Sequence, residues 1–505
     1  MSIHFLDLPS EILVLILCSL DLPSLIACIA TNRRVKSIID GSTLLQYRMA
    51  TQTACVEDNP CGDTTMTSAQ RLVALQKRQR AFAELLPSSI HTIPVDNASD
   101  ILSTFYMLSG GIFAFRDSSM KVLRWISLSS NEQQAPVWKR LELDEYILVF
   151  QLAVPEEDLL VVVSSTVPLD ANTASNAIIK LRLYEMSTQS AHRSAQEPVI
   201  NVPIAWVDWL YVDLDVCGPK IALLVHHRLF VYDWKLGRLQ MDLNNDYSAA
   251  TFLSAEVLLL TRSITGSLEL WDLEDAAGPK VVLKLPHMDE GCEYHVSRVE
   301  SNPKGSHTSP SRLPSYASFI DSLVVLQVLL INRREDSQNM FLIIPRRALL
   351  QQVPSIENCG QERSWVEWGP PVSRWLHDMY NTCDWPTIIC GQRCAFLMFD
   401  GTILLLDFNP YAYKRFLLEQ AEVKEDGRPT TGRIVLIPPL ALDVPNEMEL
   451  FGVHSQLGYV GRKTSNVDAY DGVMMDEEWI VAVKDTTDSD GEIIFGGLAS
   501  WLKSD

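Results

Sequence analysis

The chain of 505 residues lacks the features that mark secreted, membrane-spanning and zinc-binding proteins. No basic N-terminal segment is followed by an apolar stretch and a small-residue cleavage site, so no secretory signal is expected. The longest apolar run, 323–331, is interrupted by Gln327 and is too short for a bilayer, which takes about 20 residues. None of the ten cysteines forms a CxxC pair. We therefore expect reduced thiols in a protein of the cytoplasm, the nucleus or both.

Basic residues are fewer than acidic ones, and the imbalance is confined to one part of the chain. The formal net charge is −21, and residues 1–90 are balanced, so the whole excess lies in residues 91–505. An acidic surface repels phosphate backbones and anionic lipids. We therefore expect neither a nucleic-acid partner nor a membrane partner. The excess favours basic partners or simply provides solubility.

Motifs for catalysis and for cofactor or metal binding are also missing. The segment 427–433 departs from a phosphate-binding loop because arginine replaces its lysine. The adjacent His226 and His227, and the pair Cys390 and Cys394, lack further ligands at zinc spacing. We expect no catalytic, cofactor-binding or metal-binding residue, and hence a protein that is not an enzyme.

What the sequence does contain is a short apolar helix pattern near its start. Pro9 suits the first turn of a helix, Glu11 complements the helix dipole there, and residues 12–20 are all apolar or small. Such a helix is apolar on all sides, so its neighbours in the chain can cover only one stripe of it. The remaining apolar surface predicts a protein partner.

This N-terminal segment, residues 4–48, resembles the F-box family, a compact bundle of short helices. The resemblance rests on a Leu-Pro-x-Glu-Ile-Leu core at 8–13, then Ile16, Leu20, Leu25 and the basic pair Arg33-Arg34. It implies docking of the first two helices onto the Skp adaptor of Skp-cullin-F-box ubiquitin ligases. The implied adaptor-binding residues are Leu8, Pro9, Ile12, Leu13, Ile16, Leu17, Leu20, Leu25 and Ile26. The alternative is an ordinary small helical bundle.

A linker follows the expected F-box domain of residues 1–50. It covers residues 51–90 and contains a helical pattern at about 68–86, which Thr67 and Gln70 precede with capping-box spacing. The stretch resembles the helix that joins the F-box to a β domain in agaric-type fungal F-box proteins. The resemblance implies a fungal protein.

Short β-rich runs replace helical patterns in residues 91–505. The clearest hairpin joins 395–399 to 402–408 through Asp400-Gly401, a pair that tolerates the positive φ of a type I′ turn. The strands are nearly continuous in apolar residues, which predicts sheets covered on both faces. Four-stranded sheets packed radially meet this requirement, so we expect a β-propeller of six or seven blades, with seven favoured. A large β-sandwich is the alternative.

Two segments resemble the closing strand of WD-type repeats. One contains Trp271-Asp272 and the other Tyr232-Asp233. The resemblance covers two repeats and implies a strongly diverged WD-like propeller. No leucine-rich-repeat signature, the other common scaffold of F-box receptors, is present.

One insertion, residues 297–315, is rich in Ser, Pro and Gly. Its composition predicts a disordered loop between strands. The alternative is a phosphorylation-controlled element, because an added phosphate beside Lys304 and Arg312 would form new ion pairs.

These features together predict a substrate-recognition subunit of a Skp-cullin-F-box ubiquitin ligase. The F-box would bind the Skp adaptor, and through it a cullin, while the propeller binds an unidentified target for ubiquitin-dependent degradation. Two alternatives remain open at this point. One is a scaffold that binds the adaptor without ubiquitin transfer, and the other is a propeller enzyme with an acidic or histidine cluster in its central channel.

Overall fold

The fold is taken from a computed structural model of the chain. It describes residues 5–59, 62, 65–85, 89–95, 105–128, 137–167, 178–204, 211–275, 277–287, 293–305, 307, 313–331, 337–353, 360–377, 388–398, 400–426, 434–435, 455–464, 470, 472–484 and 491–497.

The N-terminal residues form a small helical bundle. Its elements are η1 (Phe5–Asp7), α1 (Ser10–Leu17), α2 (Leu22–Thr31), α3 (Arg33–Gly41) and α4 (Thr43–Ala54). The carboxylate of Asp21 accepts a hydrogen bond from the Ser24 N–H, and the Asn32 side chain accepts two at the start of α3. These caps satisfy backbone donors that have no partner within the helix. The helices enclose a core of Leu17, Leu25, Val35, Ile39 and Leu45.

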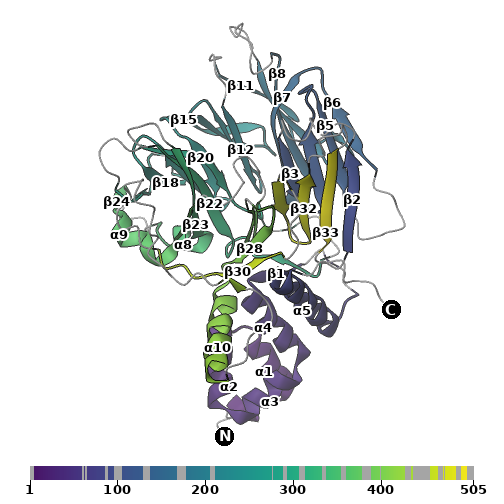
Figure 1. The fold of residues 1–505 in the computed structure, drawn as a ribbon, viewed down its shortest axis with the longest axis vertical. Helices are drawn as coiled ribbons and strands as arrows, with labels where there is room; N and C mark the ends of the chain where they lie inside the picture. Colours follow the sequence, from purple (N-terminus) through teal and green to yellow (C-terminus); the bar gives the residue numbers. More distant parts are fainter. Residues whose placement is uncertain are drawn as a thin grey trace.

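Seven sheets of four or five strands follow and form a ring, here numbered blades 1–7 (Figure 1). Blade 1 consists of β3 (Tyr106–Ser109), β4 (Ile112–Arg116), β5 (Val122–Ser127) and β6 (Lys139–Glu142), and blade 2 of β7 (Tyr146–Ala153), β8 (Leu159–Ser165), β9 (Ile179–Glu185), β10 (Ser190–Ala191) and β11 (Val199–Val202). Blade 3 consists of β12 (Val212–Cys217), β13 (Lys220–Val225), β14 (Arg228–Asp233) and β15 (Arg238–Asn244). Blade 4 consists of β16 (Ala249–Phe252), β17 (Val257–Arg262), β18 (Ser267–Asp272), β19 (Val281–Lys284) and β24 (Gln361–Arg363).

Blades 5–7 complete the ring. Blade 5 consists of β20 (Glu293–Glu300), β22 (Leu323–Ile331), β23 (Ser337–Pro345) and β25 (Arg374–His377). Blade 6 consists of β26 (Ile389–Cys390), β27 (Arg393–Leu397), β28 (Ile403–Asp407), β30 (Val460–Lys463) and β29 (Ile434–Val435). Blade 7 consists of β31 (Gly472–Met475), β32 (Trp479–Lys484), β33 (Gly491–Gly497) and β2 (Ser89–Val95). Short helices α7 (Val154–Glu157), α8 (Arg346–Leu350), α9 (Trp365–Trp368) and η2 (Pro370–Val372), and the longer α10 (Pro410–Asp426), lie between strands.

Each blade packs on its two neighbours, so the ring is closed. The first strand of each blade from 1 to 5 contacts the first strand of the next, in the order β3, β7, β12, β16 and β20. Between blades 5 and 6 the contact is made by β22 and β26. β26 then contacts β31 of blade 7, and β31 contacts β3 of blade 1. A buried apolar cluster fills each interface between blades. Both faces of every sheet are thereby covered, as the apolar strand pattern predicted. The β-propeller prediction is confirmed.

Blade 7 is completed by β2, which precedes all other strands of the propeller in the sequence. β2 pairs antiparallel with β33, with Ser89 opposite Gly497 and Val95 opposite Gly491. Residues about 400 positions apart in the sequence therefore share one sheet, which removes the open edge that a ring cut at this point would expose.

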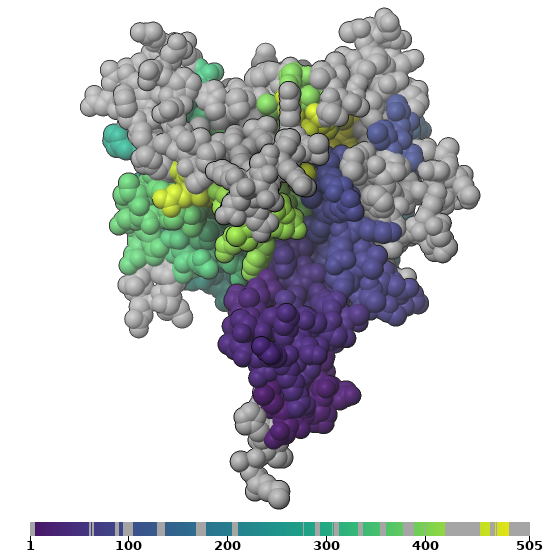
Figure 2. Space-filling view, turned by 60° about the horizontal axis from the view of Figure 1, so that its bottom comes forward, coloured from purple at the N-terminus to yellow at the C-terminus, as the bar shows by residue number. Residues whose placement is uncertain are grey.

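The ring has two distinct faces because successive strands of a blade run antiparallel. Connections between first and second strands lie on one face, which we call the F-box face; turns between second and third strands lie on the other, which we call the far face. The F-box face carries the turns at Gly391 and Asp476–Glu478, which lie beside the linker after the F-box bundle. Figure 2 shows the F-box bundle, in purple, projecting from the wider propeller.

A short sheet joins the F-box to the propeller. β1 (Val56–Asp58), directly after α4, pairs antiparallel with β21 (Ser315–Ala317) from the connection between β20 and β22. The buried Arg78 guanidinium donates to the Ser315 carbonyl at 2.7 Å and to its hydroxyl at 2.9 Å. Backbone pairing and a buried cation together fix the F-box to the propeller.

The connection that supplies β21 crosses the F-box face, and we call residues 301–318 the bridging segment. Lys304 forms a 2.6 Å ion pair with Asp215 of blade 3, and its backbone N–H donates to Glu156 of blade 2 at 2.9 Å. At the other end, the Ala317 N–H donates to Glu477 of blade 7 at 2.9 Å. Nine of its twelve described residues are buried and the other three are partly buried.

The expectation of a disordered loop is therefore wrong for the described part of 297–315. Residues 297–300 belong to β20, and the polar groups of the bridging segment are buried because carboxylates from several blades bind them. Lys304, proposed as a phosphate partner, is already paired with Asp215. The other proposed partner, Arg312, and most of the serine and threonine residues lie outside the described residues.

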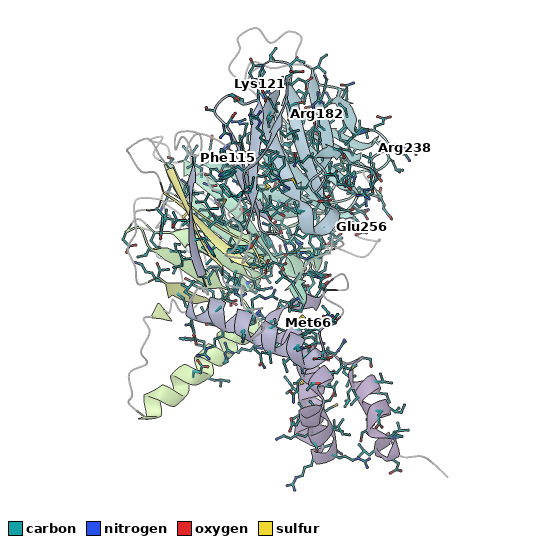
Figure 3. All side chains as sticks on the ribbon, turned by 90° about the vertical axis from the view of Figure 1, so that its right-hand side faces the viewer. Met66, Phe115, Lys121, Arg182, Arg238 and Glu256 are labelled. Carbon is teal, nitrogen blue, oxygen red and sulfur yellow. The ribbon has the colours of Figure 1, made fainter. Side chains whose placement is uncertain are left out.

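A long helix lies along the F-box face of the ring. Helix α5 (Ser68–Glu84) begins with the predicted capping box, in which Thr67 and Gln70 each bond the other's backbone. Ala81 and Phe82 pack into the apolar cluster between blades 6 and 7. Figure 3 shows α5 at the base of the propeller, with the F-box helices beneath its Met66 end. The linker helix therefore packs on the propeller and helps to attach the F-box to it.

We expect Phe82→Ala to lower the free energy of unfolding by about 3–5 kcal/mol, because a buried aromatic side chain is lost from the α5 contact. Chemical denaturation of the full chain measures the change. Val73→Ala, at a half-exposed position of the same helix, is the control and should cost less than about 0.5 kcal/mol. Equal effects of the two variants would show that α5 is not anchored through Phe82.

Glu477 makes the stability of this junction sensitive to pH. Burial raises its pKa to about 7, against the opposing charge of Arg78, and Asp476 adds to the rise. His307 lies 3.5 Å away, and burial lowers the pKa of its imidazole. An unfolded glutamate ionises near pH 4.3. The folded carboxyl keeps its proton up to about pH 7, so this group lowers stability as pH rises between those values.

We therefore expect Glu477→Gln to weaken the loss of stability between pH 5 and pH 8. The amide oxygen can still accept from the Ala317 N–H, and no buried charge forms. Thermal unfolding at pH 5, 6.5 and 8 measures the effect. Glu274→Gln, an exposed change of equal charge, should leave the wild-type profile unaltered. A profile of Glu477→Gln parallel to wild type would contradict the assignment.

Candidate functional site: an exposed apolar helix face

The first two helices of the bundle carry an apolar surface that nothing in the described structure covers. Ile12, Leu15 and Ile16 lie on one side of α1 at helical spacing and are 42, 65 and 37 % exposed. Ile26 of α2 is 51 % exposed. Isolated exposed apolar residues are ordinary, but several on adjacent short helices favour a binding surface.

The predicted adaptor-binding residues divide into two groups. Pro9, Ile12, Ile16 and Ile26 are exposed, and Leu8 and Leu20 are partly exposed. Leu13, Leu17 and Leu25 are 0 to 2 % exposed. Leu17 and Leu25 belong to the core of the bundle, and Leu13 is fully buried as well, so these three support the surface without forming it.

Leu15 is an exposed residue that the motif did not single out. It follows the periodicity of the helix and lies outside the Leu-Pro-x-Glu-Ile-Leu core. The signal that could have found it is the apolar run of 12–20, which leaves no polar side for α1. Exposure within that run is decided by how α1 packs against the later helices.

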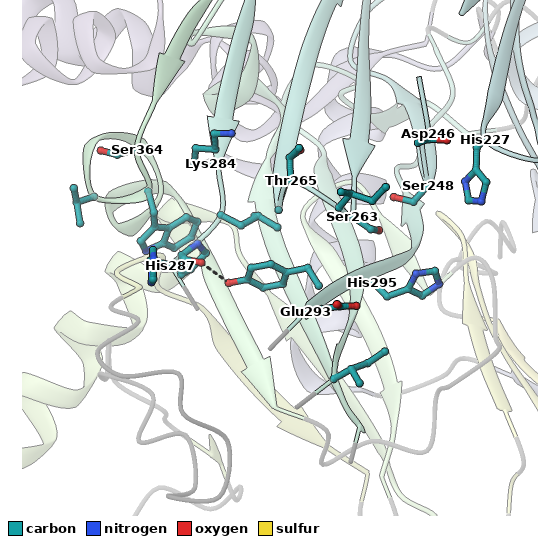
Figure 4. Close-up of a pocket in the computed structure, with 18 residues that line it drawn as sticks. His227, Asp246, Ser248, Ser263, Thr265, Lys284, His287, Glu293, His295 and Ser364 are labelled. Atoms are coloured by element: carbon teal, nitrogen blue, oxygen red, sulfur yellow. Dashed lines mark hydrogen bonds between the residues drawn. The ribbon is translucent and has the colours of Figure 1, made fainter. Parts of the chain in front are cut away.

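A second candidate surface is a hollow of about 1070 Å³ on the far face of the ring. It is lined by the turns of blades 3 and 4, the start of blade 5 and α9. Figure 4 shows His227 and Asp246 toward one end and Lys284 and Ser364 toward the other, with Glu293 and His295 along the side. The hollow therefore opens on the side of the ring opposite the F-box attachment.

Several titratable side chains near the ring centre are buried, and some of them form hydrogen bonds with the bridging segment. Asp215 accepts from Lys304, from the Thr251 hydroxyl and from the Phe252 N–H. Burial raises the pKa of Asp213 and of Glu300. The buried Arg346 donates to the Phe319 carbonyl and to the Ser301 hydroxyl. These contacts hold the bridging segment in place.

The histidine and cysteine pairs considered from sequence occupy structural positions. His226 and His227 form the turn between β13 and β14, both with positive φ, and the His227 Nδ1 bonds the Tyr247 carbonyl at 2.9 Å. Cys394 is buried, and burial raises the pKa of both Cys390 and Cys394. Within the described part of the chain, no three His, Cys, Asp or Glu side chains are grouped to hold a metal ion. No helix of that part is long and apolar enough to cross a membrane.

Comparison with known proteins agrees with the N-terminal fold. The family model described as F-box domain matches residues 5–47. A comparison with curated proteins returns no match.

Among solved structures, KlHsv2 with its loop 6CD replaced by a Gly-Ser linker is 9 % identical; the alignment covers 78 % of this chain and 98 % of that one, with a TM-score of 0.34. Chaetomium thermophilum Sqt1 bound to the N-terminus of ribosomal protein L10 is 14 % identical over 58 % of this chain and 79 % of that one, with a TM-score of 0.30. Neither likeness bears on function. The family match and the ring of sheets together identify the chain as one with an N-terminal F-box domain followed by a β-propeller.

Proposed function

We propose that this chain is the substrate-recognition subunit of a Skp-cullin-F-box ubiquitin ligase. The observation that carries the proposal is the exposed apolar face formed by Ile12, Leu15, Ile16 and Ile26, which projects away from the propeller within an F-box domain. F-box domains generally bind Skp adaptors. A surface of this kind gains most of its binding energy from removal of its apolar area from water.

The structure suits a division of labour in which this chain supplies proximity and other subunits supply chemistry. The F-box would hold the adaptor, and through it a cullin, while the propeller holds the target. Fixing a target lysine near a charged ubiquitin-conjugating enzyme raises its effective concentration. The chain would then act in ubiquitin-dependent degradation without being an enzyme itself.

The rigid mount supports this proposal. The β1–β21 sheet, Arg78 and α5 fix the F-box against blades 6 and 7. A fixed distance between adaptor and target is useful only when the two must meet a third component at a defined place. We place the protein in the cytoplasm, the nucleus or both, and the six described cysteines, all free, agree with a reducing compartment.

We expect Ile16→Asp combined with Ile26→Asp to weaken adaptor binding at least a hundredfold, because two carboxylates would be buried without partners. Both positions are exposed, so the fold should survive. Titration calorimetry with a purified Skp adaptor measures the affinity. Val73→Asp combined with Val366→Asp, at exposed positions of α5 and α9, is the charge-matched control. Wild-type affinity in the double variant would refute the proposed surface.

Leu13→Asp should behave differently from these variants. Leu13 is fully buried inside the bundle, so a carboxylate there is expected to unfold the F-box helices and to abolish binding indirectly. Loss of helical circular dichroism together with loss of adaptor binding would distinguish this outcome from a surface effect. Unchanged helicity in Leu13→Asp would contradict the burial of this side chain.

Reconstitution with purified adaptor and cullin tests the ligase role against a scaffold without ubiquitin transfer. We expect a stable complex of three proteins on size-exclusion chromatography. A complex of this chain with the adaptor that excludes the cullin would favour the scaffold. Two of the carboxylates near the ring centre, Glu156 and Asp215, bind the bridging segment, which gives them a structural role and makes the propeller-enzyme alternative the weaker one.

A further inference from the structure

The hollow on the far face carries two carboxylates that lack a cationic partner. Asp246 lies in the connection before β16, and Glu293 begins β20. Neither forms an ion pair with any residue that the structure describes. Lys284 is the one lysine in the lining, and its ammonium lies 3.3 Å from the carboxylate of Glu362. The lining is therefore negative, and it belongs to a domain that holds the whole charge excess of the chain.

Apolar groups accompany this negative charge. Ile264, in the turn between β17 and β18, is 80 % exposed, and Val366 of α9 is 78 % exposed. Two large apolar side chains that reach so far into water at one hollow gain burial when a partner covers them.

Trp365 adds a hydrogen-bond donor to the same hollow. Its side chain belongs to the lining and is more than nine-tenths buried, yet its indole Nε1–H has no hydrogen-bond partner among the described residues. A buried donor without an acceptor is costly. A peptide carbonyl that enters the hollow would supply the missing acceptor once the indole turns to present its N–H to the hollow.

We propose that the hollow binds a short extended segment of a target protein in which a lysine or arginine stands next to an apolar residue. The cationic side chain would pair with Asp246 or Glu293, and the apolar one would cover Ile264 or Val366. This inference rests on the proposed function, because it names the class of target that the receptor presents. The hollow faces away from the F-box, so a bound target would leave the adaptor surface free.

The same lining argues against two other classes of ligand. Phosphorylated segments are recognised by clusters of arginine, and the lining contains no arginine and only the paired Lys284. Nucleic acids bring a row of phosphates, which the carboxylates would repel. The charge pattern favours a basic segment over both.

Selection of a phage-displayed random peptide library against the full chain tests the proposal. We expect enrichment of peptides with Lys or Arg beside an apolar residue. Synthetic copies should bind the Asp246→Asn/Glu293→Gln variant at least tenfold more weakly than wild type. The control is Glu256→Gln/Glu274→Gln, which removes two exposed carboxylates at the opposite end of blade 4. This control should bind like wild type.

Two further measurements separate the charged and apolar contributions. Ile264→Ser should weaken peptide binding about three- to tenfold. Raising NaCl from 50 to 500 mM should weaken peptide binding more strongly in wild type than in the carboxylate variant. Equal peptide affinities of wild type and the carboxylate variant would overturn the proposal. Failure to enrich any peptide, or enrichment of acidic or phosphorylated ones, would overturn it as well.

Adaptor binding distinguishes this inference from the function on which it rests. The Asp246→Asn/Glu293→Gln variant should bind a purified Skp adaptor as wild type does, because the two surfaces lie on opposite faces. Peptide binding that fails while adaptor binding persists would overturn the hollow assignment alone. Adaptor binding that fails in wild type while peptides still bind would overturn the receptor role and leave the basic-segment site standing.

Discussion

The arrangement of this protein depends on the pairing of β1 with β21. The three residues of β1, which follow the last F-box helix, pair with β21 in the connection between two strands of blade 5. The buried Arg78 of α5 donates a hydrogen bond to the same strand β21. Without this sheet the F-box would be held to the ring mainly through α5 and its contacts with blades 6 and 7. With it, backbone hydrogen bonds help to set the orientation of the F-box, whereas exposed ion pairs alone would contribute little.

The bridging segment explains why such a small sheet is sufficient. Its ends are fixed at Lys304 by blades 2 and 3, and at Ala317 by blade 7. The position of β21 is therefore stabilised by contacts with three blades of the ring. Burial of Lys304 against Asp215 is expensive for each charge alone, so loss of either partner would leave an uncompensated charge and destabilise the whole connection.

The sequence predicted what is encoded locally and missed what is decided by distant contacts. Helical spacing in α1, the Thr67 capping box and the apolar hairpins depend on neighbours within a few residues, and the structure contains all of them. The bridging segment looked like a disordered loop because its composition is polar, and its burial depends on partners such as Glu156, 148 residues away. The division of the F-box leucines into buried and exposed could not be read from the motif, since it follows from packing among helices. The far-face hollow combines three blades and α9, which no linear pattern reveals.

The closure of the ring by β2 imposes an order on biosynthesis. The F-box and β2 emerge from the ribosome before β33, the strand that pairs with β2 and is made some 400 residues later. The F-box is thus synthesised long before the propeller can close. In the proposed role, a prematurely terminated chain would carry an F-box without a complete ring, and it would compete for adaptor molecules while delivering no target to them.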